Sequence, residues 1–195
     1  MILEGVVTTL DPDGSVHVSC MGPTVEGAFE RLVFRPFPAS RTLENLRRTG
    51  QGVMHVTDDV ELLARAAIGK LAQLPNLLPA PGINGFILSD ACRWYAFRVT
   101  AIDDRLPRVS VSCRVVAAGC VREFFGFNRA KHAVLEAAIL ATRVDLVAMR
   151  RIRAEMRRLA PLVEKTGGPA EQRAFELIKQ HLDDPRHLEP RPEIG

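Results

Sequence analysis

Short runs of alternating apolar and polar residues fill the first half of the chain, which predicts β-strands joined by turns. Residues 2–10 are rich in β-branched side chains, and residues 11–14 (Asp-Pro-Asp-Gly) have the composition of a turn. Every second residue of 16–20 is apolar, so we expect this segment to pair with the first strand as a hairpin. A third strand is predicted at residues 28–35, because Pro36 cannot donate a ladder hydrogen bond.

Helical spacing then interrupts the strand pattern. Residues 40–49 predict a short helix that Ser40 or Thr42 can cap and that Gly50 ends. A strand at residues 52–57 follows, and then a helix that begins at Asp58 and Asp59.

The next segment, residues 75–92, holds three prolines and two glycines and predicts a long loop with a short strand at residues 85–88. Strands are expected at residues 94–102 and 109–117, with a turn through residues 103–107 between them. After Phe127 the pattern predicts one helix from Arg129 to about Leu159, a second helix at residues 170–182, and a loose tail from Asp184.

These elements predict an α+β chain whose strands form a small barrel, since regular βαβ alternation is absent. We expect a barrel domain at residues 1–125 and a helical subdomain with the loose tail at residues 126–195. The 47% hydrophobic content supports a substantial core. The formal net charge of +3 is too small to indicate a partner.

Cysteine usage and the N-terminal residues predict a soluble cytoplasmic protein. The four cysteines, at positions 20, 92, 113 and 120, form no C-x-x-C pair, so reduced thiols are expected. Glu4 interrupts the apolar N-terminal segment and no basic stretch precedes it, unlike a signal peptide. The longest apolar run, residues 133–149, contains three charged residues and does not predict a membrane span.

Several motifs of common enzymes are missing from the sequence. It has no G-x-G-x-x-G or G-x-x-x-x-G-K-[ST] loop, no H-E-x-x-H spacing and no G-x-S-x-G elbow. A hydrolase or zinc enzyme would therefore have to build its site from residues far apart in the chain.

The segment at residues 35–50 is the best candidate for binding an anion. It predicts a strand that ends at a proline-rich bend and a helix that begins with Ser40, Arg41 and Thr42. A helix N-terminus has free N–H groups and partial positive charge, hydroxyls add donors, and arginine can pair bidentately with phosphate. The alternative is ordinary helix capping beside a surface arginine. Asn45 is either a further ligand or a polar residue in mid-helix.

The order of these elements around S-x-T-x-x-N-L-x-x-T-G resembles the flavin-reductase-like FMN-binding split barrels. It is most similar to a subfamily of uncharacterised FMN-binding proteins from methanogens and bacteria of one-carbon metabolism. The matching motifs are Glu4-x-Val-Val-Thr-Thr, Met21-Gly22-Pro23, Ser40-Arg41-Thr42-x-x-Asn45-Leu46, and Phe125-Gly-Phe-Asn-Arg-Ala-Lys-His132 leading into residues 136–143. The similarity covers residues 1 to about 160.

This resemblance implies a split β-barrel followed by C-terminal helices, with FMN bound noncovalently at the interface of a homodimer. It implies phosphate contacts from Ser40, Arg41 and Thr42, and an isoalloxazine ring lying along Cys20, Met21 and Gly22. A glycine there suits close approach of the backbone to a flat ligand. The chain differs from such proteins at two positions, having Cys20 where a proline is expected and His55 where an asparagine is expected.

A second block of candidate cofactor-binding residues lies at the start of the long helix. Asn128 is a good N-cap, and Arg129, Lys131 and His132 follow in the first turn, where cations are unfavourable unless an anion is near. The flavin phosphate or an acidic substrate would be such an anion. The alternative is that these residues are solvated, or paired with Glu123 and Glu136.

The sequence thus predicts an FMN-dependent oxidoreductase that passes hydride or electrons through a noncovalent flavin. One alternative is a flavin carrier or sensor without turnover. Another is a basic RNA- or protein-binding domain that uses the arginines of residues 143–158, although the aromatic residues expected for base stacking are missing from that segment. No metal is expected, and the electron donor and acceptor are not identified.

Overall fold

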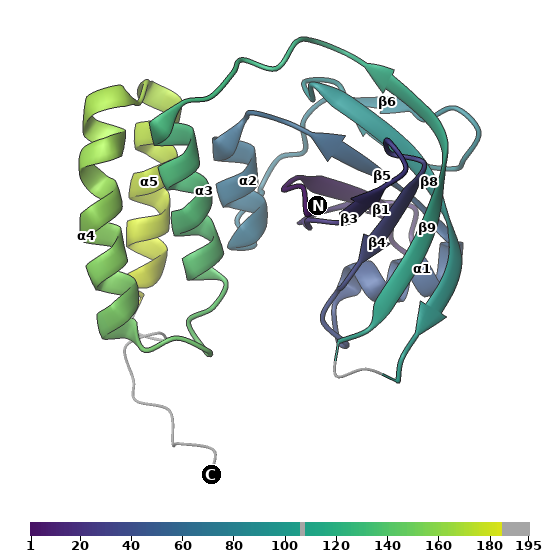
Figure 1. The fold of residues 1–195 in the computed structure, drawn as a ribbon, viewed down its shortest axis with the longest axis horizontal. Coiled ribbons are helices and arrows are strands. Elements are labelled where there is room, and N and C mark those ends of the chain that lie inside the picture. The colour runs from purple at the N-terminus through teal and green to yellow at the C-terminus, as the bar shows by residue number, and fades with distance from the viewer. Residues whose placement is uncertain (106–107, 185–195) are drawn as a thin grey trace. The chain divides into compact units, whose positions relative to one another are not determined.

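The strands of the first half form one antiparallel sheet in the computed structural model, which describes residues 1–105 and 108–184 (Figure 1). Its seven strands lie in the order β2-β1-β5-β8-β9-β4-β3. They are β1 (Val6–Leu10), β2 (Val16–Cys20), β3 (Thr24–Glu26), β4 (Arg31–Phe34), β5 (Gln51–Val56), β8 (Arg93–Asp103) and β9 (Ser110–Cys120). The predicted hairpin of the first two strands is confirmed, with Thr8 opposite Val18.

The third strand is shorter than predicted. Residues 28–35 were expected to form it, but β4 begins only at Arg31, and the separate strand β3 precedes it. Gly27, Ala28 and Phe29 have φ angles of 56°, 52° and 73°, which no strand can adopt. This left-handed turn divides the predicted strand in two.

The sheet closes on itself through the N-terminal residues. β2 and β3 are the two edges of the sheet, yet they follow each other in the chain, so the sheet must curl. Ile2 forms a bridge to Thr24, the Leu3 N–H donates to the Pro23 carbonyl, and the Met21 N–H donates to the Gly5 carbonyl. The result is a split barrel, as predicted.

Helix α1 (Arg41–Thr49) lies between β4 and β5 in the chain, as expected, with Ser40 as its N-cap and Gly50 in the left-handed region at its C-terminus. Its Leu43 and Leu46 are buried in the barrel core beside Phe34 and Phe97. This packing fixes which face of α1 points inward and therefore where its polar residues lie.

A small hairpin lies within the predicted loop at residues 75–92. It pairs β6 (Leu77–Pro79) with β7 (Phe86–Leu88), so the short strand expected near residues 85–88 is confirmed and its partner was missed. Buried His55 on β5 holds this hairpin, because its Nε2 atom accepts a hydrogen bond from the Leu88 N–H at 3.1 Å. Its Nδ1 atom lies 3.2 Å from the Val6 carbonyl oxygen.

Four helices form a second unit, in which they lie side by side (Figure 1). They are α2 (Val60–Ala67), α3 (Arg129–Ala141), α4 (Met149–Thr166) and α5 (Pro169–Leu182). The single helix expected from Arg129 to Leu159 is wrong, because the chain leaves the helical conformation after α3 at Thr142 and resumes it at Met149. The turn lets the apolar faces of α3 and α4 pack against each other, which one straight helix could not do.

The contacts divide the chain into Met1–Asp58 with Ala72–Phe125, and Asp59–Leu71 with the residues from Gly126 onward. The predicted division into a barrel domain at residues 1–125 and a helical subdomain at residues 126–195 stays a prediction. Within residues 1–125, the segment 59–71 groups with the later helices, because α2 packs against α3 and α5. Of the tail predicted to be loose from Asp184, residues 185–195 lie outside the described residues, as do residues 106–107 of the predicted turn.

Candidate functional site at the start of α1

The N-terminus of α1 has the properties of an anion site. Ser40 is extended, with φ −84° and ψ 137°, and its hydroxyl accepts from the Leu43 N–H at 3.3 Å. The N–H groups of Arg41 and Thr42 belong to the first turn, where no helical carbonyl can accept them. This end of the helix therefore offers free donors and partial positive charge.

Two polar side chains contact Thr42, which is 2% exposed. Its hydroxyl lies 2.8 Å from the Ser19 hydroxyl and 3.1 Å from His17 Nε2. His17 and Ser19 are two residues apart on β2, so they point to the same face of the sheet and meet the start of α1. Burial and the nearby Arg41 guanidinium lower the pKa of His17, so its ring is neutral at pH 7.

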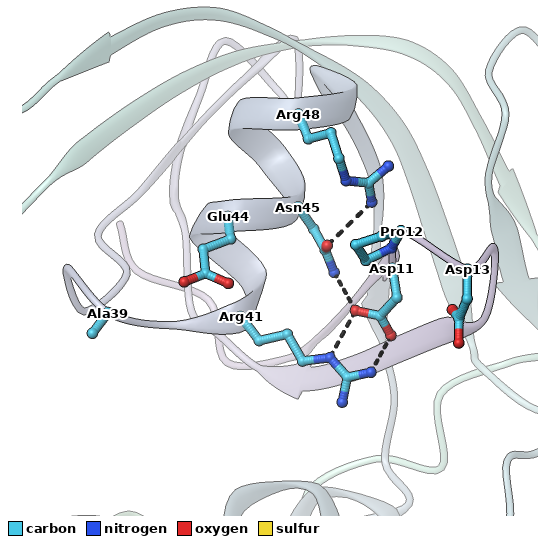
Figure 2. Close-up of a pocket in the computed structure, with 8 residues that line it drawn as sticks. All are labelled: Asp11, Pro12, Asp13, Ala39, Arg41, Glu44, Asn45 and Arg48. Carbon is cyan, nitrogen blue, oxygen red and sulfur yellow. Dashed lines mark hydrogen bonds and ion pairs between the residues drawn. The ribbon is translucent and has the colours of Figure 1, made fainter.

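Arg41 reaches toward Asp11, which directly follows β1 (Figure 2). It makes a two-pronged ion pair with Asp11, in which Nε donates to Oδ1 at 2.7 Å and Nη2 donates to Oδ2. Asn45 lies on the same side of the helix and donates from Nδ2 to Asp11 Oδ1 at 2.9 Å and to the Thr9 hydroxyl at 3.1 Å. Of the four residues predicted on α1, Ser40 thus caps the helix and Thr42 contacts His17 and Ser19, whereas Arg41 and Asn45 both contact Asp11.

Asp11 is the centre of this second group and is 4% exposed. Burial alone would raise its pKa, but hydrogen bonds from Arg41, Asn45 and Ser15 outweigh burial and hold the pKa below its ordinary value. Asp11 is therefore ionised at neutral pH and keeps Arg41 in place.

An open pocket of about 600 Å³ lies beside Arg41, which is large enough for a small ligand or part of a larger one. Figure 2 shows its lining, where Arg41 and Arg48 stand among the carboxylates of Asp11, Asp13 and Glu44. Arg41 is paired with Asp11, and Arg48 donates to the Leu10 carbonyl and to Asn45 Oδ1. The pocket suits a polar ligand rather than an apolar one.

Cys20, Met21 and Gly22, where the flavin ring was expected, lie together at the end of β2. Burial, reinforced by Glu4, raises the pKa of Cys20 to about 12, so its thiol stays protonated and unreactive at neutral pH. A Cβ on Gly22 would lie 3.0 Å from the Leu3 carbonyl oxygen and 3.2 Å from a Glu4 carboxylate oxygen. The glycine thus allows the N-terminal segment to approach, a role that needs no ligand.

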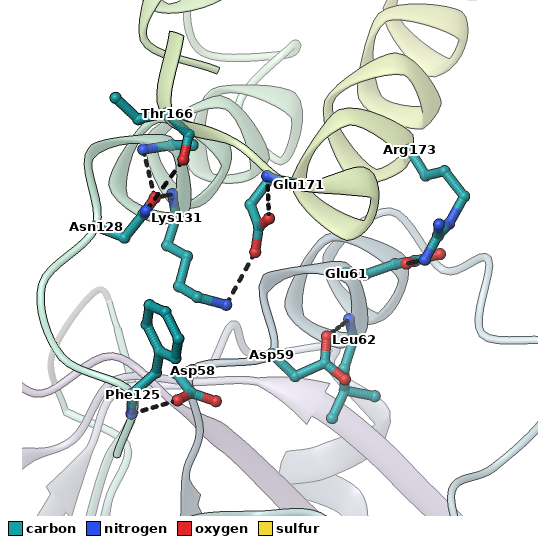
Figure 3. Close-up of polar contacts among 12 residues, drawn as sticks. Asp58, Asp59, Glu61, Leu62, Phe125, Asn128, Lys131, Thr166, Glu171 and Arg173 are labelled. Carbon is teal, nitrogen blue, oxygen red and sulfur yellow. Dashed lines mark hydrogen bonds and ion pairs between the residues drawn. The ribbon is translucent and has the colours of Figure 1, made fainter. Parts of the chain in front are cut away.

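The second predicted block lies at the start of α3 (Figure 3). The Asn128 side chain caps the helix by accepting from the Ala130 and Lys131 N–H groups at 2.8 and 3.0 Å, and it donates to the Thr166 carbonyl at 3.1 Å. Lys131 pairs with buried Glu171 at 2.9 Å, so a protein carboxylate is the anion near this cation. That pairing differs from both partners considered above, Glu123 and Glu136.

Arg129 and His132 are exposed, and no ion pair joins either of them to another residue in the described ranges. Their contact with a cofactor stays a prediction.

At the end of the barrel unit, Asp58 accepts from Arg122 and from the Phe125 N–H at 2.6 Å, which ties β5 to the segment after β9.

Sequence reasoning missed three residues of the site. His17 and Ser19 were interpreted only as the polar face of a half-buried strand, and Asp11 only as part of a turn. The signal for the first two was present, because polar residues two apart on a strand share a face and precede the Met21-Gly22 pair. No local signal distinguishes Asp11 from a solvent-exposed turn residue.

All four cysteines are free, as expected. Within residues 1–105 and 108–184, no group of three or more histidine, cysteine or acidic side chains is placed to hold a metal ion. No helix in the same part of the chain is long and apolar enough to cross a membrane.

Two family models match the chain. They are described as "Protein of unknown function (DUF447) N-terminal domain" over residues 3–122 and "Protein of unknown function (DUF447)" over residues 128–180. The chain belongs to the DUF447 family. No curated protein matches this DUF447 sequence.

Solved structures share its fold. An FMN-bound DUF447 protein of Methanosarcina mazei matches with a TM-score of 0.80 and 25% identity, covering 93% of this chain and 95% of that one. The 2-nitrobenzoate 2-nitroreductase of Pseudomonas fluorescens matches with a TM-score of 0.51 and 19% identity, covering 60% of this chain and 64% of that one. Flavoredoxin of Methanosarcina acetivorans matches with a TM-score of 0.52 and 10% identity, covering 61% of this chain and 69% of that one. These matches confirm the predicted split barrel of the flavin-reductase-like class, followed by C-terminal helices.

Proposed function

We propose that this DUF447 protein binds FMN noncovalently, with the phosphate at the N-terminus of α1. The observation that carries the proposal is the match to the FMN-bound protein of M. mazei. That protein belongs to the same family, and the match covers 93% of this chain and 95% of that one. Similarity of this kind over both units supports a shared ligand more strongly than the barrel alone, which hosts many functions.

The residues at the start of α1 fit a phosphate group. The Ser19 hydroxyl and the His17 ring lie 2.8 and 3.1 Å from the Thr42 hydroxyl, and these groups can donate to phosphate oxygens. The first-turn N–H groups add donors and partial positive charge, and Arg41 adds further donors. The flavin ring would then lie along the end of β2, beside Cys20, Met21 and Gly22. These residues follow Ser19 in the chain and lead away from the β1–β2 turn.

We propose electron or hydride transfer as the reaction class, because a bound flavin supplies that chemistry. The protein's own residues would bind and orient it. Cys20 would not act as a thiolate, because its pKa of about 12 keeps it protonated. A flavin carrier without turnover is distinguished by adding a reduced nicotinamide or deazaflavin donor without oxygen, since only an oxidoreductase bleaches the flavin absorbance with the donor present.

We also propose a homodimer with the flavin near the interface. Phe124 and Phe125 at the end of the barrel unit are 48% and 74% exposed, which is unusual for adjacent large aromatic residues. Burial of such residues against a second copy would stabilise a dimer. Light scattering of the purified protein tests this, and a monomer at micromolar concentration would contradict it.

The test of the proposed function is an absorbance spectrum of the purified protein, recorded before and after incubation with FMN and desalting. We expect flavin bands to remain with the protein. Arg41→Ala should lose most of the retained flavin, whereas Arg47→Ala should keep it, since Arg47 lies on the same helix but pairs with Asp104. A wild-type protein that retains no flavin would contradict the proposal.

A further inference from the structure

Buried Asp11 accepts three hydrogen bonds from two side chains of α1. Arg41 donates two of them, and Asn45 donates one at 2.9 Å. The Ser15 hydroxyl lies 3.2 Å from Asp11 Oδ2, but it has one proton and lies closer to Asp13 Oδ1, at 2.6 Å. The side chains of α1 therefore occupy most of the acceptor sites of Asp11.

The same contacts hold the Arg41 guanidinium in one orientation. Arg41 uses Nε and Nη2 for Asp11, which leaves Nη1 and the second Nη2 proton available, three of its five N–H donors. Its side chain is 60% exposed while Asp11 is 4% exposed. The arginine therefore presents donors to solvent from a fixed plane, whereas an unpaired arginine would sample many rotamers.

Asn45 reinforces Asp11 and has no free side-chain group to offer a ligand. Its amide nitrogen donates to Asp11 and Thr9, and its amide oxygen accepts from Arg48 at 3.2 Å. The residue is 2% exposed. Asn45 thus lies beneath Asp11 as part of its support.

We propose that Asp11 is a positioning residue for phosphate recognition, which holds Arg41 in the orientation that receives the phosphate of FMN, and that Asn45 acts through Asp11. This rests on the proposed function. Ordering Arg41 before binding removes an entropic cost that binding would otherwise carry. The negative charge of Asp11 is offset by Arg41 itself, so the pair presents donors without net charge.

The measurement is the affinity for FMN and for riboflavin, which lacks the phosphate, in wild type and variants. We expect Asp11→Asn to weaken FMN binding about tenfold and to leave riboflavin binding unchanged. The matched control is Asp13→Asn, which removes the same charge from the same pocket, while Asp13 bonds to Ser15 and not to Arg41. The control should retain the wild-type ratio of the two affinities.

A double-mutant cycle separates positioning from other roles. If Asp11 acts through Arg41, Asp11→Asn adds nothing to the loss caused by Arg41→Ala. Additive losses would overturn the inference, as would an unchanged ratio or tighter FMN binding in Asp11→Asn, which would make Asp11 a competing charge. If Asp11→Asn does not fold, Arg41→Lys provides the test, because lysine keeps the charge but cannot form the two-pronged pair with Asp11. A wild-type ratio of FMN to riboflavin affinity in Arg41→Lys would overturn the inference.

These outcomes are distinct from failure of the proposed function. A wild-type protein that binds neither flavin contradicts FMN binding itself. A wild-type protein that binds FMN and riboflavin equally well contradicts the phosphate site, whatever the variants do.

Discussion

Replacing His55 with glutamine is expected to remove a pH dependence of stability that this histidine creates. His55 is fully buried on β5, and its ring accepts a hydrogen bond from the Leu88 N–H through Nε2, so Nδ1 carries the proton and faces the Val6 carbonyl. Protonation of Nε2 would break the contact that holds β7. Burial accordingly lowers the pKa of His55 from 6.5 to about 4.

The size of the effect follows from this difference in pKa. Between pH 6.5 and 4 the unfolded chain binds a proton that the folded protein does not, so stability is full above pH 6.5 and falls as the pH is lowered toward 4. At about 1.4 kcal/mol per pH unit, the loss approaches about 3 kcal/mol near pH 4. The free energy of unfolding should therefore be steeply pH-dependent in this window.

Urea unfolding between pH 4.5 and 7.5 measures the effect. Trp94 is the chain's one tryptophan, and it lies opposite His55 in the pairing of β5 with β8, so its fluorescence reports on the barrel unit. His55→Gln should be less stable at pH 7 and should show a much flatter pH profile. His17→Gln, which changes a partly exposed ring, should remove a smaller part of the slope. An unchanged slope in His55→Gln would refute the assignment of a buried neutral imidazole.

Two further substitutions test packing and capping. Gly119→Ala should destabilise the barrel by about 1–3 kcal/mol and shift the Trp94 emission, because a Cβ there would lie 2.7 Å from the indole ring; wild-type emission and stability would show that the ring is free to move. Asn128→Ala should cost the helical unit about 1–2 kcal/mol, measured by circular dichroism during urea unfolding, because it removes the cap of α3, whereas exposed Arg129→Ala should change little; equal effects would argue against the cap.

Local signals in the sequence were enough to place most elements of the barrel. Ser40 and Gly50 bounded α1 correctly because cap and stop residues act on their own backbone. The turn between α3 and α4 was missed, since the apolar pattern continues through residues 142–148 without a glycine or proline. The membership of α2 in the helical unit was also missed, because it depends on contacts with helices that come much later in the chain.

The sequence could place the candidate residues on one helix, but it could not predict their contacts. Ser40, Arg41, Thr42 and Asn45 do share the first turns of α1. Which way each one points depends on residues far away in the chain, since Arg41 meets Asp11 across 30 positions and Thr42 meets Ser19 across 23. A sequence pattern shows which chemistry is available at a helix end, and only the packing of α1 on the barrel decides which partner each side chain finds.

The most direct test of FMN binding at α1 is a crystal structure of the protein grown with FMN. The account predicts the phosphate at the N-terminus of α1, within hydrogen-bond distance of Thr42 and Arg41, with the Arg41–Asp11 pair intact and the ring along Cys20, Met21 and Gly22. A flavin whose phosphate lies away from α1, or a structure without flavin at saturating FMN, would contradict it.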